Sequence, residues 1–323
     1  MRTAAYVVPV ALAGFFAVAS APAQDYPNRP IRMIVGFPPG GGTDVMARLV
    51  APRMTETWSQ QVVIDNRPGA TGIIGTDLVA KAVPDGYTLL MGHVATNAIA
   101  WSLFAKLPFD PAKDFTPITR VSSVPHVLVV HPSLDARSVK DLIALAKAKP
   151  GELNYGSAGS GAATHLAAEL FKSMAGVNLV HIPYRGPAEA LNALVMNEAQ
   201  VEIQSMLSAT PFVQGGRLRL LATTGSKRLA EYPDVPTVAE AAVPGYAVYT
   251  WFGVVAPAGV PPPVLARLHV ALVQALTSPE MRRQFTNQGA EVVANTPAEF
   301  SAFLREEVAK WNKVIRDSGA RVD

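Results

Sequence analysis

Short apolar runs alternate along the chain with glycine-bearing loops and with amphipathic stretches of helical period. In the first third, apolar runs predict strands over residues 31–35, 61–65 and 87–92. Amphipathic stretches between them predict helices from Val45 to about Thr57 and from Ile73 to Ala82. Strands and helices that alternate in this order predict βαβ units and a mainly parallel sheet, so the expected fold class is α/β.

A second series of the same kind covers roughly residues 126–224. Its strands are predicted over 127–130, 177–181, 200–205 and 218–223, and its helices over 138–149, 162–175 and 188–196. Two similar α/β units that face each other predict a cleft between them, which is a common place for a ligand.

The last third of the chain has a different pattern, which is mainly helical. A proline-rich turn over 257–263 precedes predicted helices over 264–276, 279–288 and 297–318, whereas residues 109–117 earlier in the chain are expected to be irregular. The last helix has Thr296 as its predicted cap, Pro297 at its first position and Glu299 three residues after the cap. Its apolar stripe predicts packing on a core; the stripe consists of Phe300, Phe303, Leu304, Val308, Trp311 and Ile315.

The loop over residues 36–44, with the sequence GFPPGGGTD, joins the first predicted strand to the first helix. Gly41 and Gly42 have no side chains to screen their N–H groups, and Thr43 or Asp44 is expected to cap the helix. A bare backbone at a helix N-terminus is suited to an anion. An ordinary tight turn between strand and helix is the alternative interpretation.

A second glycine-rich stretch, over residues 156–161, leads into the helix at 162–175. Loops 36–44, 66–72 and 92–97 lie at the carboxyl ends of predicted strands, where ligands gather in such sheets. The two glycine-rich loops, 36–44 and 156–161, suit a carboxylate because its oxygens accept several charge-assisted hydrogen bonds. Hydroxyl and amide groups that could add contacts are those of Thr96, Asn97, Ser157, Ser160 and Thr164. Arg185 is the one cation near a predicted loop, where it could pair with a ligand carboxylate. A solvated surface arginine is the alternative interpretation.

Composition narrows the class of protein further. The chain has 323 residues, of which 49% are apolar, so it can bury a sizeable core in one large or two modest domains. Its formal charge of +3 and the lack of a basic run give no reason to propose a nucleic-acid partner. The absence of cysteine excludes disulfides, thiolate metal sites and cysteine nucleophiles.

Residues 1–23 have the pattern of a secretory signal peptide. Arg2 precedes an uncharged apolar stretch, and Ala21-Pro22-Ala23 forms a small-x-small cleavage site. A single membrane anchor is the alternative, but the run is short for a span of about 20 residues. No later stretch is long and apolar enough to span a bilayer. The mature chain is therefore expected to begin near Gln24 and to be a soluble protein of a bacterial periplasm.

Catalytic and metal-binding patterns are weak. Neither Ser157 nor Ser160 sits in a nucleophile-elbow motif, and the glycine loops match neither a dinucleotide fingerprint nor a Walker motif. The six histidines are scattered, so no metal site and no cofactor are predicted. A secreted hydrolase that uses Ser157 or Ser160 with His165 or His181 stays open as an alternative to a binding protein.

At this point several motifs resemble one family. The chain is similar to the tripartite tricarboxylate transporter receptors, the Bug-type periplasmic solute-binding proteins, over essentially its whole mature length. The motifs that carry the resemblance are Asp25-Tyr26-Pro27 with Pro30-Ile31-Arg32, residues 37–44, Asn66-Arg67-Pro68-Gly69-Ala70, residues 84–90, Pro183-Tyr184-Arg185-Gly186, residues 233–237 and Trp251-Phe252-Gly253.

The resemblance implies a two-domain Venus-flytrap fold with the class II strand order. Domain 1 would combine residues 24–124 with 247–323, and domain 2 would be residues 125–246, with the ligand cleft between them. The implied function is capture of a small organic acid, without catalysis, for inner-membrane permease subunits. A monomer is expected. A sensor subunit that presents its ligand to a signalling receptor is a further alternative.

The resemblance also carries over ligand contacts. In the family, carboxylates are held largely by backbone amides and ordered waters, and Asp44 is expected to fix its loop rather than to touch an anion. The implied contacts are Phe37, Pro38, Gly40, Gly41, Thr43, Asp44, Thr96 and Asn97 from the first domain, and Ser157, Ala158, Gly159, Ser160, Thr164, His165 and Tyr184 from the second. Relatives usually have two glycines before the strand at 200–205 and an aspartate near position 204. Here Gln204 stands there, so the resemblance leaves the identity of the ligand open in this region above all.

Overall fold

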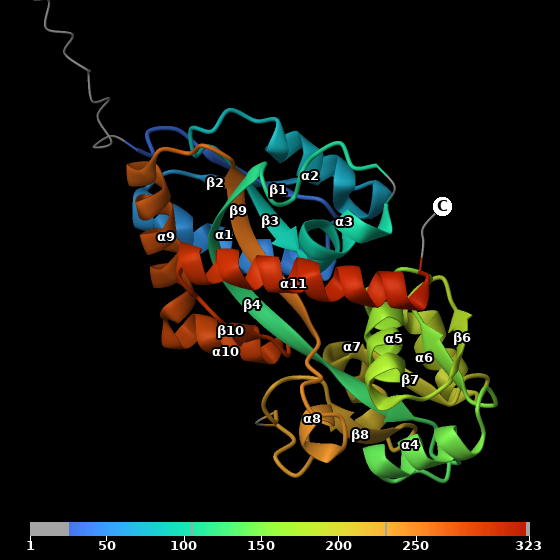
Figure 1. Ribbon diagram of the computed structural model, residues 1–323. Coiled ribbons are helices and arrows are strands. Elements are labelled where there is room, and N and C mark those ends of the chain that lie inside the picture. The colour runs from blue at the N-terminus through green and yellow to red at the C-terminus, as the bar shows by residue number, and fades with distance from the viewer. Residues whose placement is uncertain (1–25, 105, 230, 321–323) are drawn as a thin grey trace, which may run out of the picture.

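The computed structural model describes residues 26–104, 106–229 and 231–320 (Figure 1). The predicted signal peptide and its cleavage site lie outside the described residues. None of the helices in the described ranges is long and apolar enough to cross a membrane.

The strands in this part of the chain form one hydrogen-bonded sheet with the order β2-β1-β3-β9-β4-β7-β5-β6, and β8 and β10 also pair with β4. Their bounds are β1 (Ile31–Val35), β2 (Val62–Asn66), β3 (Thr88–His93), β4 (Phe115–Val130), β5 (Asn154–Ser157), β6 (Val180–Pro183), β7 (Val201–Ser205), β8 (Arg219–Thr223), β9 (Tyr249–Pro257) and β10 (Glu291–Val292).

Strand β4 is shared by the two parts of the molecule. Its residues 115–125 pair with β9, and its residues 126–130 pair with β7 and β8. We call the part built on β1, β2, β3, β9 and β10 the first lobe, and the part built on β5 to β8 the second lobe; Figure 1 shows β4 running from one to the other. Pairing is parallel among β1, β2 and β3 and among β5, β6 and β7, but β4 and β9 pair antiparallel with each other and with their neighbours. The predicted parallel arrangement therefore holds for the triplets β2-β1-β3 and β6-β5-β7, and not for β4, β8, β9 and β10.

The helices cover both faces of the sheet. Their bounds are α1 (Gly42–Trp58), α2 (Ile73–Ala80), α3 (Ala100–Leu103), α4 (Val139–Ala148), α5 (Ala163–Ala175), α6 (Pro187–Val195), α7 (Met206–Gln214), α8 (Val238–Ala241), α9 (Pro262–Thr277), α10 (Pro279–Asn287) and α11 (Pro297–Ser318). In the first lobe, α1, α9 and α10 share one core cluster, whereas α2, α3 and α11 belong to a cluster that continues into the second lobe.

Helix α11 lies along both lobes (Figure 1). The predicted cap is present, because Thr296 Oγ1 accepts the Glu299 N–H and the Glu299 side chain accepts the Thr296 N–H. The predicted stripe is confirmed as well: Phe300, Trp311 and Ile315 are buried in the continuous core, and the other three stripe residues pack against it. This helix therefore helps to hold the two lobes on one core.

The structure corrects one expectation about the region before the second series. Residues 115–117 belong to β4, although the proline- and aspartate-rich stretch predicts irregular structure there. Pro117 lacks an N–H for the ladder, and the pairing of β4 with β9 shifts register between Pro117 and Thr119 and again between Arg120 and Ser122. A shift in register lets a strand continue past a proline. The pattern of residues in the sequence does not reveal such a shift.

A buried carboxylate ties α11 to β9. Glu307 Oε2 accepts hydrogen bonds from Trp251 Nε1 at 2.9 Å and Trp311 Nε1 at 3.0 Å, and Lys310 pairs with the same side chain. We expect Glu307→Met to lower the free energy of unfolding by about 3 kcal/mol, because two buried indole N–H groups lose their acceptor. Urea denaturation followed by tryptophan fluorescence measures this loss.

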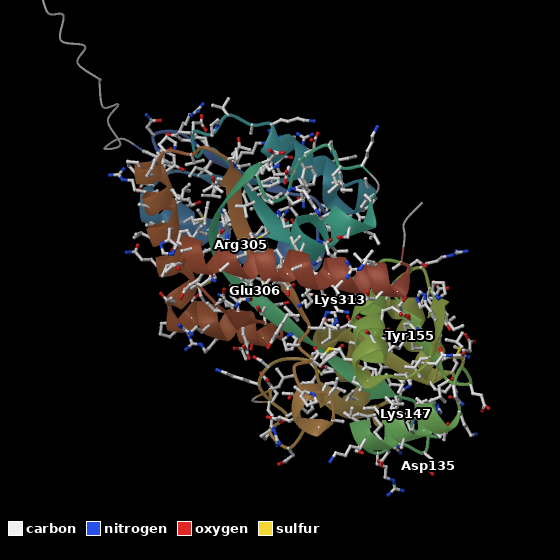
Figure 2. The ribbon with its side chains drawn as sticks, viewed as in Figure 1. Asp135, Lys147, Tyr155, Arg305, Glu306 and Lys313 are labelled. Carbon is white, nitrogen blue, oxygen red and sulfur yellow. The ribbon has the colours of Figure 1, made fainter. Side chains whose placement is uncertain are left out.

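The matched control is Glu306→Met, at the exposed neighbouring position on α11 (Figure 2). It should change the unfolding free energy by less than about 0.5 kcal/mol. Equal effects of the two substitutions would show that the indole acceptor contributes little to stability.

Candidate functional site

The first glycine loop ends at an N-terminus of α1 that no side chain caps. Gly41 is the N-cap residue in extended conformation, and the first bond in the helix runs from Val45 N to Gly41 O at 2.9 Å. The expected cap at Thr43 or Asp44 is therefore wrong: both lie inside the first turn, because the helix already begins at Gly42. The N–H groups of residues 42–44 have no acceptor within the helix and carry the positive end of its dipole.

Asp44 holds the loop in shape. Its Oδ2 accepts from Gly40 N at 2.9 Å and from Arg48 Nε at 2.8 Å, and its Oδ1 accepts from Asn66 Nδ2 at 2.9 Å. Burial raises the pKa of Asp44, but the hydrogen bonds from Arg48, Gly40 and Asn66 outweigh it and lower the pKa to about 2. The carboxylate is thus ionised, almost completely buried and fully engaged, which fits the expectation that it supports the loop.

The other predicted residues of the first lobe are divided between surface and core. Pro38, Gly40 and Gly41 are exposed, and Phe37 is half-buried. Thr96 and Asn97 are buried in a π-helical turn over Ala95–Ile99, where Asn97 Oδ1 accepts from Thr96 Oγ1 at 2.8 Å. These two polar side chains therefore serve the turn itself.

The second glycine loop leads into α5 in the same way. Ala162 is the N-cap residue, no side chain caps the helix, and Leu166 N makes the first bond to Ala162 O at 3.0 Å. The side chains of the first turn instead brace the loop: Thr164 Oγ1 accepts from Ala158 N at 2.9 Å, and His165 Nδ1 accepts from Gly161 N at 3.0 Å. The first N–H groups of α5 therefore have no acceptor within the helix, like those of α1.

Ser157 lies beneath this loop, 2.6 Å from His181 Nε2. The contact is one that the hydrolase alternative requires, yet Ser157 is fully buried and its Oγ also contacts the Gly159 backbone. Burial, with the nearby His165, lowers the pKa of His181 to about 4, which makes its imidazole a weak base at neutral pH. His165 stacks on His181 with 4.0 Å between ring centroids. Among the described contacts, no carboxylate orients His181, so the arrangement lacks the third group of a triad.

Tyr184 and Gln204 occupy different surroundings. Tyr184 is half-buried and donates its N–H to Ser157 O, and its carbonyl borders Gly159. Ser160 is exposed on the same loop. Gln204 is buried on β7, where its Nε2 donates to Glu202 Oε1 at 2.9 Å. The glutamine therefore pairs with a second buried polar residue.

The two sets of predicted residues do not contact each other. Among the described residues, no hydrogen bond or ring contact joins the first-lobe set to the second-lobe set. Two histidines lie outside the predicted contacts: the His93 ring is 5.1 Å from that of Phe37, and His126 lies in β4 where the strand changes partner from β9 to β7. Sequence reasoning missed both, because scattered histidines give no spacing signal; the one available sign was the position of His93 at the end of a predicted strand.

A cavity of about 430 Å³ lies elsewhere between the lobes. None of the predicted ligand residues lines it. Its walls come from α7, the segment after β8 and the turn from α10 to β10, namely Met206, Thr210, Pro211, Gln214, Leu229, Glu231, Tyr232, Thr286, Asn287, Gly289, Ala290 and Glu291. Within the described ranges, no cluster of three or more histidine or acidic side chains could hold a metal ion.

Two α/β lobes that share crossing strands, with uncapped helix N-termini after their first strands, define the class as a solute-binding protein of the periplasmic-binding-protein fold. The particular family follows from comparison with known proteins. The profile of the "Tripartite tricarboxylate transporter family receptor" matches residues 46–320, and the chain belongs to this family.

Known relatives agree with this membership. The chain is 40% identical to "Protein BugT" of Bordetella pertussis over 97% of this chain and 96% of that protein. It is similar to an R. palustris protein solved with adipate, with 37% identity, a TM-score of 0.78 and coverage of 92% of this chain and 100% of the other. It is also similar to MatC from Rhodopseudomonas palustris with bound malate, with 32% identity, a TM-score of 0.73 and coverage of 90% and 100%.

The predicted family and fold class are therefore confirmed. The family consists of periplasmic transporter receptors, so the chain is a solute-binding receptor and not an enzyme, which removes the hydrolase alternative. The predicted ligand contacts and domain boundaries stay predictions.

Glu202 gives this site a testable pH dependence. It is fully buried, its Oε2 has no hydrogen-bond partner, and burial raises its pKa from 4.5 to about 8 in spite of the hydrogen bond from Gln204. The folded state therefore keeps a proton that the unfolded state releases, so stability falls as pH rises from about 4.5 to about 8. In the wild type the free energy of unfolding should fall by up to about 1.4 kcal/mol per pH unit in this window because of Glu202. We expect Glu202→Gln to remove this decline.

Urea unfolding of the variant and the wild type at pH 5, 6.5 and 8 measures the difference. The control is Glu198→Gln, at an exposed position just before β7. A Glu202→Gln effect that is the same at all three pH values would contradict the buried proton.

Proposed function

We propose that this protein is a periplasmic receptor that captures a small carboxylate-bearing solute between its lobes for the inner-membrane permease of a tripartite tricarboxylate transporter. The observation that carries the proposal is the pair of uncapped helix N-termini, on α1 in the first lobe and α5 in the second. Helices α4, α10 and α11 begin with a Ser or Thr side-chain cap, whereas α2, α6, α7 and α9 also lack one. What supports the proposal is therefore the combination of an uncapped N-terminus with the glycine loops 36–44 and 156–161 that precede α1 and α5. Adipate and malate in two similar structures support an organic acid as the ligand.

The chemistry of the two loops suits a carboxylate held without a salt bridge. Each N-terminus presents several N–H groups and about half a positive charge. Asp44 adds a negative charge beside α1, but Arg48 pairs with it at 2.8 Å and offsets that charge. Arg185 is exposed, and its N–H donates to Glu189 at the start of α6. Neutral backbone donors are therefore the main binding groups in this proposal.

The proposed site residues are those that the family resemblance gave. Gly41, Thr43 and the loop before them would hold the first carboxylate of the ligand from the first lobe, and Ser160 with the α5 N-terminus would hold the same carboxylate from the second. Ser157, Thr164, Asn97 and Gln204 are buried and engaged within their own lobes. Their role in the proposal is to shape the loops.

The proposed domains are residues 24–124 with 247–323, and residues 125–246, in a monomeric mature chain that begins near Gln24. The chain would cross between them at β4 near residues 124–126 and again just before β9. Ligand binding would favour the closed arrangement, which the permease would recognise. The sharing of β4 by both lobes supports such a hinge, since the strand continues through the crossing.

A thermal-shift screen over mono-, di- and tricarboxylates tests the function. An acid at a hundredfold excess over Kd should stabilise the protein by about 2.7 kcal/mol. Gly41→Val places bulk at the α1 N-terminus, where an added Cβ would be 3.4 Å from Pro38 O, an ordinary contact. We expect this variant to lose affinity for the best acid by more than about tenfold in titration calorimetry.

The melting temperature of ligand-free Gly41→Val should match that of the wild type, because the position is exposed and its backbone is extended. If no carboxylic acid stabilises the wild type, the proposed function is wrong. If Gly41→Val binds the best acid as tightly as the wild type, the loop assignment alone is wrong.

A further inference from the structure

We propose that His93 and His126 form a neutral floor between the two lobes that binds a second oxygen acceptor of the ligand. The inference rests on the proposed function, because it assumes a ligand whose first carboxylate lies at a glycine loop. It assigns a specificity role to two side chains outside the predicted contacts.

His93 presents a hydrogen-bond donor beside the first glycine loop. It is the last residue of β3, and its ring packs near Phe37 and Phe252, with centroid distances of 5.1 Å and 5.3 Å. Its Nδ1 accepts from the Ala95 N–H at 3.1 Å. The neutral ring therefore carries its proton on Nε2, and no described hydrogen bond uses that N–H. Since the side chain is only half-buried, this donor can meet a ligand.

His126 supplies the second polar atom. It lies in β4 where the strand changes partner from β9 to β7 and β8, and 2% of the residue is exposed. Its N–H and carbonyl bond to Thr224, and its Nε2 lies 2.9 Å from Thr250 Oγ1 on β9. The remaining ring atom, Nδ1, is buried without a partner. Buried polar atoms are seldom left unpaired, so this nitrogen is expected to pair with a water molecule or a ligand oxygen, and the proposal assigns it the ligand oxygen.

The ring proton of His126 can lie on Nδ1, the nitrogen that would face the ligand. A hydroxyl group both donates and accepts, so Thr250 can donate to Nε2 and leave the ring proton on Nδ1. In that state the floor offers two N–H donors, one from each histidine. Both rings lie along the same stretch of β9, since His93 is opposite Phe252 in the ladder and His126 Nε2 is 2.9 Å from Thr250 Oγ1, two residues before Phe252. Burial, with a smaller contribution from His126, lowers the pKa of His93 to about 4. Burial lowers the pKa of His126 to about 4 as well, so the pair is neutral at pH 7.

Two neutral N–H donors select for oxygen. A carboxylate, keto or hydroxyl oxygen can accept from them, whereas a methyl group would leave them unpaired in a closed protein. The floor adjoins Phe37, so a ligand whose first carboxylate lies at the α1 N-terminus reaches it with its other end. The receptor should therefore prefer diacids to monoacids of the same length.

Titration calorimetry with matched acids tests this preference. The probes are succinate, glutarate and adipate, each paired with the monoacid of equal carbon number: butyrate, pentanoate and hexanoate. We expect the wild type to bind its best diacid at least about tenfold more tightly than the matching monoacid. His93→Phe and His126→Phe should reduce this ratio to near one and leave monoacid affinity within about twofold of that of the wild type.

Further variants keep the test decisive. His93→Gln and His126→Gln keep a side-chain N–H donor and should restore part of the diacid preference, and they replace the phenylalanine variants if these fail to fold. His131→Gln is the matched control: His131 directly follows β4, bonds to Ser133 and should leave the ratio unchanged.

Either of two results would overturn the floor. The first is a wild type that binds diacids and monoacids equally, which would mean that only water pairs with the histidines. The second is a diacid preference that survives both phenylalanine substitutions or their glutamine replacements. A wild type that binds no carboxylic acid would instead refute the proposed function.

Discussion

The pairing of β4 is the constraint on which the rest of the molecule depends. One strand supplies the ladder for β9 in the first lobe and for β7 and β8 in the second, so neither lobe completes its sheet without it. The two parallel triplets, β2-β1-β3 and β6-β5-β7, are thereby joined in one sheet. Helix α11 strengthens the connection, because its buried residues belong to a core cluster that continues from the first lobe into the second. The chain crosses between the lobes at β4 and at the segment before β9, and the proposed closure would bend the molecule there.

In the proposed function, unpaired backbone donors bind the anion. Helices α1 and α5 follow the carboxyl ends of β1 and β5, and in each the polar side chains of the first turn are directed to the loop before it. Asp44 binds Gly40 N, Thr164 binds Ala158 N, and His165 binds Gly161 N. Bracing the loops in this way leaves the first helical N–H groups unused. Rigid, neutral donors of this kind can hold a carboxylate with little reorganisation.

Much of the fold could be predicted from the sequence, and the predictions that were wrong have physical causes. The capping box at Thr296 and the stripe of α11 are local patterns, and both are present in the structure. The start of α1 was misplaced because Gly42 and Thr43 have low helix propensity, although the turn at Pro38 already directs the chain into the helix. The predicted strand over 127–130 is shorter than β4 because Pro117 and Pro125 signal breaks. In the structure a register shift follows Pro117, and β4 changes its partner from β9 to β7 just after Pro125. The burial of Glu202 and His126 results from tertiary packing, which no local pattern encodes.

In the proposals above, His93 and His126 contribute both to the choice of ligand and to the closure of the lobes. In the proposed function the glycine loops would accept any carboxylate, because backbone N–H groups do not distinguish the rest of the solute. The proposed floor lies at the end of β3 and on β4, where β4 passes from one lobe to the other. His126 is held by Thr224 of the second lobe and by Thr250 of β9, so its ring is placed by both sides of the crossing. A ligand oxygen that pairs with Nδ1 would stabilise the arrangement of the crossing in which these bonds exist. Recognition of the far end of the solute would then favour the closed lobes, whereas an acid bound at one glycine loop alone would not.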